Sequence, residues 1–347
     1  MTPTTKSRTI IATWFHADQP GYEGQYSQTL GDSKSQEHYD IYLRCIYLFF
    51  FFLESHKRTE QRYLFINSHA ESIITKDFRN QLENWNVKIV VLINHHIPPS
   101  KNGVKWRNQF FMLDIISYLS KFESNCIILD SDVIATTNKE VEFTNQAEVI
   151  GYVVSQDPTE TINGLQVREL SELYSLFTNT HDKRKIKYLG GEFIALKGNI
   201  IKEFSKICEL YYAKNLLMAQ QGFLYCREEA HLFSLVSANF RLDETGDKWI
   251  SRIWTQPWTF RSIPANWETL VFLHLPAEKK TGIKRVYKII EKKRASESPE
   301  KIGETAIRLY GLLGIPKYGI KKLVFDLYDL RKGGLRHLIT RFDKIFR

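Results

Sequence analysis

Apolar runs with strand and helix patterns alternate through the first hundred residues of this chain. Short runs typical of buried strands occur at residues 8–13, 62–67 and 87–93. The segments 36–54 and 76–85, which lie between them, have the apolar spacing of helices. Three strand–helix alternations of this kind are typical of βαβ units. They predict an α/β fold with a mostly parallel, doubly wound sheet.

The composition is that of a soluble globular protein, with 43% hydrophobic and 25% charged residues. The length of 347 residues allows one large domain or two ordinary ones. Four cysteines without C-x-x-C spacing lie mostly among apolar neighbours, as is typical of buried free thiols in a reducing compartment: Cys45, Cys126, Cys208 and Cys226. Residues 1–8 are polar and lack the apolar core of a signal peptide, so we expect a cytoplasmic protein.

The most apolar stretch, residues 41–53, contains four consecutive phenylalanines. It also contains Arg44 and is followed by Glu54. A membrane-spanning helix needs about 20 predominantly apolar residues, and this stretch is shorter. We therefore expect a buried helix here.

A short apolar run ends in two carboxylates, at Asp130-Ser131-Asp132. Such a run predicts a buried strand, and the acidic pair falls where the strand leaves the core. Open α/β sheets bind ligands at that edge. Two carboxylates there suit a divalent cation such as Mg²⁺ or Mn²⁺, which in turn suits a diphosphate. A polar turn at the end of a strand is the alternative reading.

Later segments add further candidate groups in a definite order. A glycine pair and Glu192 open an apolar strand within residues 188–196, and Glu228-Glu229 lie near the start of a helical segment at 227–236. A strand at 270–273 is followed by His274. Helices are expected at 105–121, 165–177 and 200–218, and a strand at 148–155.

This order of segments resembles the GT-A class of nucleotide-sugar glycosyltransferases. The closest resemblance is to the retaining family that includes glycogenin and bacterial lipopolysaccharide galactosyl- and glucosyltransferases. In that family a strand ends in D-x-D, a strand with small residues at its entrance follows, and then come an acidic helix start and a late strand ending in His with Lys shortly after. The resemblance covers roughly residues 8–280. The family's usual Gly and Lys-Pro-Trp after the His are absent here, and Pro276 and Lys279-Lys280 stand in that region instead.

The resemblance implies a metal centre that serves a diphosphate. Asp132 and His274 would be direct Mn²⁺ ligands, and Asp130 either a further ligand or a contact to the ribose. The cation, which could also be Mg²⁺, would neutralise charge on the diphosphate leaving group. Lys279 or Lys280 would reach the diphosphate.

The resemblance also implies where the donor lies. Ala12 and Thr13, at the end of the first strand, are candidates for the nucleotide site. Lys105 and Arg107, at the start of the next long helix, are candidates for contacts to the donor sugar or phosphate. Arg107 is the stronger of the two because a guanidinium can grip phosphate with two hydrogen bonds. A solvated helix start is the alternative.

Three glutamates are candidate catalytic groups. Glu192 would lie at the acceptor end of the pocket. Glu228 or Glu229 would act as general base toward the acceptor in an inverting enzyme, or would position sugar hydroxyls in a retaining one. The sequence does not choose between these outcomes, and carboxylates are favoured at helix starts in any case.

Positive charge gathers at the end of the chain. Residues 279–347 contain 19 Lys and Arg against 7 Asp and Glu, a net +12, whereas the first 278 residues carry −3. We therefore expect a GT-A domain at residues 1–280 and a basic helical region at 281–347. Basic helices with an apolar face bind anionic membrane surfaces, and a solvated helical cap is the alternative. No recognition motif indicates nucleic-acid binding.

The resemblance thus implies a metal-dependent hexosyltransferase. It would move a hexose from a nucleotide sugar, with UDP the favoured nucleotide, to a glycan or lipid-linked acceptor in surface polysaccharide synthesis such as that of lipopolysaccharide. It would be cytoplasmic and peripheral on the inner face of the membrane. Two alternatives stay open: a phosphohydrolase of the haloacid dehalogenase type, which also carries D-x-D after a strand, and a non-catalytic GT-A-like scaffold.

Overall fold

The computed structural model describes residues 9–19, 32–98, 107–144, 146–181, 184–256, 260–264, 266–304 and 306–315, with four single positions beyond them, 320, 323, 324 and 327. Lys105 and, within the basic C-terminal region, residues 305, 316–319, 321–322, 325–326 and 328–347 lie outside the described residues. The chain forms two compact units. Unit 1 contains Met1–Asp40, Thr59–Ser131 and Val141–Trp249, and unit 2 contains Ile41–Arg58, Asp132–Glu140 and Ile250–Arg347.

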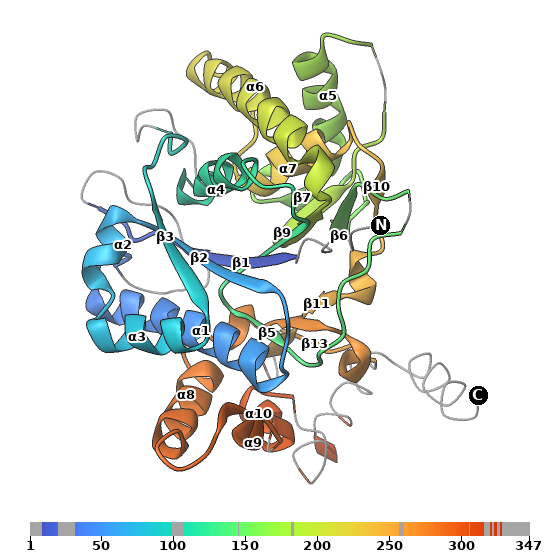
Figure 1. Ribbon diagram of the computed structural model, residues 1–347. Coiled ribbons are helices and arrows are strands. Elements are labelled where there is room, and N and C mark those ends of the chain that lie inside the picture. Colours follow the sequence, from blue (N-terminus) through green and yellow to red (C-terminus); the bar gives the residue numbers. More distant parts are fainter. Residues whose placement is uncertain are drawn as a thin grey trace, which may run out of the picture. The chain divides into compact units, whose positions relative to one another are not determined.

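Unit 1 is built on a seven-stranded mixed sheet in the order β10-β6-β9-β4-β1-β2-β3 (Figure 1). Its strands are β1 Ile10–Phe15, β2 Gln61–Asn67, β3 Val87–Leu92, β4 Cys126–Leu129, β6 Val149–Ser155, β9 Tyr188–Leu196 and β10 Leu242–Asp243. All neighbours pair in parallel except at β9, which runs antiparallel to both β4 and β6. The α/β class is confirmed, and β9 makes the sheet mixed.

Helices cover both faces of this sheet. On one face a single hydrophobic core joins β1, β2, β4 and β9 to α4 Phe111–Leu119, α6 Ile201–Gln220 and α7 Glu229–Ser237. The helix α5 Val167–Thr178 packs into the same core, after a short hairpin formed by β7 Thr161–Ile162 and β8 Leu165–Gln166. On the other face lie α2 Ser68–Ile73 and α3 Lys76–Asn84, which pack beside β2 and β3 (Figure 1).

Unit 2 is built on a smaller three-stranded sheet in the order β11-β14-β5. The strands are β5 Val133–Ala135, β11 Ile250–Arg252 and β14 Phe272–His274, and a separate hairpin pairs β12 Trp254–Gln256 with β13 Phe260–Ser262. Three helices follow: α8 Gly282–Lys293, α9 Pro299–Glu304 and α10 Ala306–Leu312.

The phenylalanine-rich helix α1, Gln36–Ser55, belongs to unit 2 from Ile41 onward. Phe49, Phe50, Phe51 and Phe52 are all buried, and Phe52 stacks on the ring of Tyr310. The predicted buried helix is thus confirmed. No helix in the described part of the chain is both long and apolar enough to cross a bilayer.

Most predicted elements are present, with shifted ends. The predicted helix 105–121 is a 3₁₀ turn, Arg107–Phe110, followed by α4. The predicted helix 165–177 begins as β8, and α5 starts at Val167, where Gln166 and Glu169 form a capping box. Short elements without a strong apolar pattern, such as α2 and β10, were not predicted. The predicted division of the chain at residue 280 stays a prediction, and the two compact units divide it at other points.

Candidate functional site

The order of strands in unit 1 reverses between β1 and β4. From β1 the chain adds β2 and β3 on one side, and β4 then pairs with β1 on the other side. In open α/β sheets the crevice outside the carboxyl ends of the strands at such a reversal is the usual ligand site. Asp130 follows β4 directly, and Thr13 lies near the end of β1. Both residues therefore lie at this switch point.

Asp132 is placed beside His274 by the small sheet of unit 2. Strand β5 begins immediately after Asp132 and pairs antiparallel with β14, so that Val133 lies opposite His274. The backbone N–H of Leu275 extends this pairing by donating to the Asp132 carbonyl at 3.0 Å. His274 Nε2 then lies 3.2 Å from Asp132 Oδ2.

Lys279 is brought to the same carboxylate by a tightly anchored turn. After β14 the chain forms a 3₁₀ turn, Pro276–Glu278, and the Glu278 carboxylate accepts the backbone N–H of Gly282 at 2.9 Å and the Thr281 hydroxyl at 3.1 Å. A Cβ on Gly282 would overlap that carboxylate, so this position requires glycine. The anchored turn leads directly into Lys279, whose Nζ lies 3.3 Å from Asp132 Oδ2 and 5.0 Å from the centre of the Tyr42 ring.

The Asp132 carboxylate is buried and negatively charged. Burial alone would raise the pKa of Asp132, but the charges of Lys279 and His274 outweigh it and hold that pKa below its usual value. Beyond these two contacts, the Asp132 carboxylate oxygens have no further side-chain hydrogen-bond partner within the described part of the chain. The oxygens therefore keep their capacity to bind a cation.

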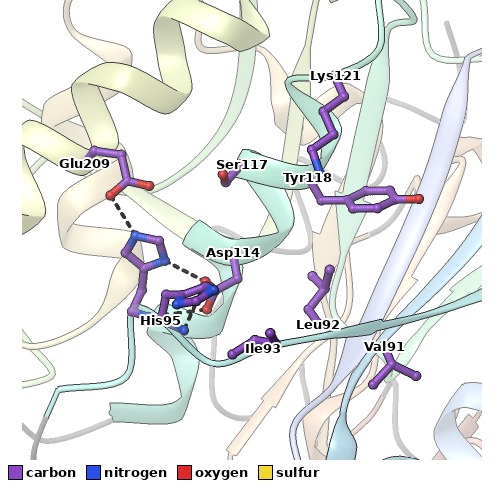
Figure 2. A pocket seen from close by; sticks show the side chains of 10 residues that line it. Val91, Leu92, Ile93, His95, Asp114, Ser117, Tyr118, Lys121 and Glu209 are labelled. Atoms are coloured by element: carbon purple, nitrogen blue, oxygen red, sulfur yellow. Dashed lines mark hydrogen bonds and ion pairs between the residues drawn. The ribbon is translucent and has the colours of Figure 1, made fainter.

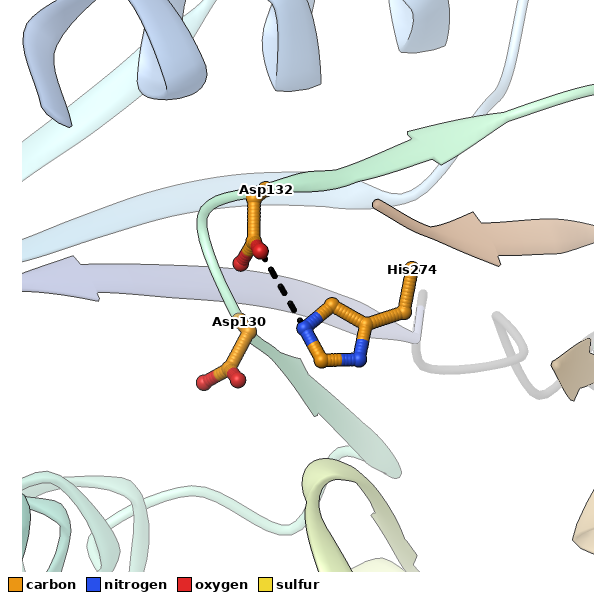
Figure 3. Close-up of side chains that lie close together, drawn as sticks. All are labelled: Asp130, Asp132 and His274. Atoms are coloured by element: carbon orange, nitrogen blue, oxygen red, sulfur yellow. Dashed lines mark ion pairs between the residues drawn. The ribbon is translucent and has the colours of Figure 1, made fainter. Parts of the chain in front are cut away.

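Asp130, Asp132 and His274 form a candidate metal centre (Figure 3). Each offers one ligand atom, and these atoms all lie within 4.8 Å of one another. Two carboxylate oxygens and an imidazole nitrogen are donors that suit Mn²⁺ or Mg²⁺. The buried, unbonded oxygens of Asp132 are consistent with that fit.

Comparisons with known proteins do not indicate a function for this chain. No protein-family model matches the chain, and no curated protein matches it. The function must therefore be argued from the side chains themselves.

In unit 1 two of the three candidate glutamates lie close to the glycine pair of β9. The register of β4 and β9 pairs Leu129 with Phe193, and the Asp130 N–H donates to the Glu192 carbonyl at 3.3 Å. The Glu192 carboxylate folds over Gly190, where a Cβ would overlap it. A Cβ on Gly191 would likewise overlap the carboxylate of Glu229. The glycine pair thus makes room for two buried carboxylates.

Glu229, at the start of α7, has a carboxylate oxygen that lacks a hydrogen-bond partner among the described residues. That oxygen is Oε2, and the residue is buried. Burial, with the charges of Glu228 and Asp130, raises the pKa of Glu229 well above its ordinary value. A perturbed buried acid beside a candidate metal ligand is typical of a functional group.

Glu228 is instead held by its neighbours. Its Oε1 accepts the Tyr188 hydroxyl at 2.7 Å, and its Oε2 accepts the Asn163 side chain at 2.6 Å. His231 lies 3.7 Å away, but burial lowers the pKa of His231 to about 3, so that ring is neutral and forms no ion pair. Glu228 is thus held by hydrogen bonds through both carboxylate oxygens, whereas Glu229 has one oxygen without a partner among the described residues.

The candidates for donor binding differ in accessibility. Ala12 lies in the hydrophobic core, whereas the Thr13 hydroxyl is buried without a hydrogen-bond partner within the described residues. Arg107 is buried, and its Nε donates to the Pro98 carbonyl at 2.6 Å. Lys280 is half-buried. The donor-binding roles of these residues, and of Lys105, stay predictions.

One polar cluster in unit 1 was missed from the sequence. His96 lies between two carboxylates, with Nδ1 2.7 Å from Asp114 Oδ1 and Nε2 2.7 Å from Glu209 Oε2 (Figure 2). The three residues line a cavity of about 580 Å³ together with apolar side chains at the end of β3, such as Leu92. His96 is 18 positions from Asp114 and 113 positions from Glu209 along the chain, so no spacing pattern in the sequence reveals the cluster.

A second missed group follows β1. Asp18 is buried and accepts hydrogen bonds from the Ser33 hydroxyl, at 2.6 Å, and from the side chain of Asn108. His16 Nδ1 lies 3.7 Å from the same Asp18 carboxylate. An acidic residue three positions past a strand was a usable sequence signal, and it marks the same sheet edge as Asp130.

Proposed function

We propose that this protein is a metal-dependent glycosyltransferase of the GT-A type that transfers a hexose from a UDP-sugar. One observation carries the proposal: Asp130, Asp132 and His274 each offer one ligand atom, these atoms lie within 4.8 Å of one another, and Asp130 directly follows the buried strand β4. A nucleoside diphosphate is the ligand that such a centre fits, because a hard divalent cation binds diphosphate oxygens.

The residues around the centre have complementary roles in the proposal. Asp132 and His274, together with Asp130, would hold the cation. A cation bound there would supply positive charge to the diphosphate leaving group. Lys279 adds a second positive charge beside Asp132, which further favours the departing anion.

Glu229 and Glu192 are the proposed groups on the sugar side of Asp130. Both are buried, and the glycine pair of β9 accommodates both carboxylates. Glu229 has an unbonded carboxylate oxygen, which supports a contact to a sugar hydroxyl or to the acceptor. Glu228 supports the site indirectly, by holding Tyr188 and Asn163 in place.

The proposed acceptor is a glycan or a lipid-linked glycan. Helix α8 buries Ile283, Val286 and Ile290 and exposes Lys284, Lys288 and Lys292, which are spaced four residues apart on one face. A row of exposed lysines supports association with an anionic membrane, since each basic residue near such a surface contributes about 1 kcal/mol.

The proposal is tested by screening UDP- and GDP-hexoses for Mn²⁺-dependent hydrolysis and transfer. Asp132→Asn keeps the shape of the side chain and removes its charge. It should lower turnover about 100-fold or more, because it weakens cation binding at the leaving group. Asp77→Asn, which removes an exposed carboxylate from α3, is the matched control and should retain wild-type turnover.

Two results would contradict the proposal. One is full activity of Asp132→Asn or of the wild type in excess chelator, which would exclude metal dependence. The other is release of inorganic phosphate from sugar phosphates with no nucleotide-sugar turnover, which would indicate a phosphohydrolase. Absence of metal-dependent UDP binding by calorimetry would favour a non-catalytic scaffold.

A further inference from the structure

We infer that Lys279 is a displaceable internal cation that couples binding of a divalent metal ion to binding of a diphosphate. In the protein without ligands its ammonium group neutralises Asp132, and a metal ion must compete with it. A diphosphate draws the ammonium away and so opens Asp132 to the metal. The inference rests on the proposed function and concerns the regulation of the same site.

The positions of the charges carry the inference. Lys279 Nζ and His274 Nε2 lie 3.3 and 3.2 Å from the same oxygen, Asp132 Oδ2. The Lys279 and Asp132 side chains are only 8% and 1% exposed, so solvent screens their interaction weakly. A divalent cation bound to this oxygen would lie within a few ångströms of a buried ammonium group. Repulsion between the two positive charges therefore opposes metal binding while Lys279 stays in place.

The backbone near Lys279 is fixed, but its side chain has four rotatable bonds. Glu278 ties the preceding residue to Thr281 and Gly282. The Lys279 ammonium lies over the face of the Tyr42 ring, at 5.0 Å from its centre, and a cation–π contact of this kind tolerates a shift of the cation more readily than a hydrogen bond does. The ammonium can therefore move while the turn stays where it is, provided that another anion replaces Asp132 as its partner.

A diphosphate is such an anion, and the exchange makes the two ligands cooperative. When the ammonium moves to the diphosphate, the negative charge of Asp132 is no longer compensated by Lys279 and becomes available to the metal. The diphosphate then gains both the ammonium and the metal as partners. Coupling of this kind is reciprocal, so UDP should raise Mn²⁺ affinity by the same factor by which Mn²⁺ raises UDP affinity.

The test measures Mn²⁺ affinity by electron paramagnetic resonance, with and without UDP, and corrects for Mn²⁺–UDP association in buffer. Lys279→Met keeps most of the apolar stem and removes the charge. This variant should bind Mn²⁺ alone about tenfold or more tightly than the wild type, because the competing charge is gone. The factor by which UDP strengthens Mn²⁺ binding should fall by about the same amount.

Two further variants serve as controls. Lys202→Met removes an equal charge from an exposed position of α6 and should bind Mn²⁺ like the wild type. Asp132→Asn should bind Mn²⁺ weakly with or without UDP. The role of Lys279 would be overturned if Lys279→Met bound Mn²⁺ no more tightly than the wild type does. If the wild type then still bound Mn²⁺ and Asp132→Asn abolished that binding, the proposed function would stand. No Mn²⁺ binding by the wild type, with or without UDP, would refute the proposed function itself.

Removal of a buried cation can destabilise the fold, so thermal melting provides an independent measurement. Mn²⁺ should raise the melting temperature of Lys279→Met by more than it raises that of the wild type, because tighter binding to the folded state stabilises it more. An equal or smaller shift would contradict the inference. Lys279→Arg, which keeps the charge, should retain the wild-type coupling between Mn²⁺ and UDP.

Discussion

The cluster of His96, Asp114 and Glu209 allows a test of whether burial or distance determines how much an ion pair stabilises the fold. Both carboxylates lie 2.7 Å from the His96 ring, one at each nitrogen. The Asp114 side chain is 4% exposed, and that of Glu209 is 48% exposed. The two ion pairs thus have equal lengths but differ widely in the solvent exposure of the carboxylate.

Their contributions to stability should differ accordingly. A buried hydrogen bond to a charged group contributes about 1.5–3 kcal/mol, so Asp114→Asn should lower the free energy of unfolding by about 2 kcal/mol. Asp114 also accepts the backbone N–H groups of His95 and His96, at 3.2 and 3.4 Å, and the asparagine oxygen can keep part of these bonds. Solvent screens the half-exposed pair, so Glu209→Gln should cost about 0–1 kcal/mol.

The cluster also predicts a dependence on pH. Burial alone would lower the pKa of His96, but hydrogen bonds and charge from Asp114 and Glu209 outweigh it and raise that pKa above 6.5. A raised pKa in the folded state means that the protonated ring stabilises the fold. This contribution is complete below the unfolded-state pKa of about 6.5 and is lost as the pH rises through the higher folded-state pKa.

Urea unfolding of the wild type, Asp114→Asn, Glu209→Gln and His96→Gln at several pH values from 6 to 9 measures these effects. The wild type should lose stability across this range, and His96→Gln, which cannot titrate there, should lose less. Equal losses of stability for Asp114→Asn and Glu209→Gln would refute the argument from burial. A pH dependence that is the same in His96→Gln and the wild type would refute the argument from protonation.

Two further predictions concern glycine and glutamate positions. Gly198→Ala should lower the melting temperature sharply or prevent folding, because the added Cβ would overlap the backbone carbonyl of Glu123. Gly311→Ala in α10 should be neutral or should stabilise the fold by up to about 1 kcal/mol, because no atom lies within 4 Å of the added Cβ. Thermal melting of the two variants tests this difference. Glu228→Gln weakens the charged hydrogen bond from Tyr188 and should cost about 1–3 kcal/mol without changing Mn²⁺ affinity, and a large loss of Mn²⁺ binding would show that Glu228 has a direct role.

The regular elements of unit 1 could be predicted because their signals are local. The strands at Gln61–Asn67 and Val87–Leu92 and the helix at Gln36–Ser55 lie within a residue or two of the predicted ranges. The antiparallel direction of β9 could not be predicted, since an apolar run looks the same in either direction. In the small sheet of unit 2, β14 overlaps the strand predicted at 270–273, whereas β5 and β11, each of three residues, carry too little periodicity and were missed.

Sequence by itself determined the residue types of the candidate site: a pair of carboxylates after a buried strand, a late histidine and its neighbouring lysines. These follow from the chemistry of side chains and from apolar patterns over a few residues. Only the tertiary structure decided which of them meet. The pairing of β5 with β14 brings His274 to Asp132, and the anchored turn at Glu278 adds Lys279 rather than leaving the choice of lysine open.

The same holds for the acids of unit 1. The sequence treats Glu228 and Glu229 alike, as neighbouring carboxylates near a helix start. In the folded chain Glu228 is hydrogen-bonded to Tyr188 and Asn163, whereas Glu229 lies over Gly191 with an oxygen that no described residue bonds. Hydrogen-bond partners far apart along the chain make that difference, and local sequence patterns carry no information about partners at that separation.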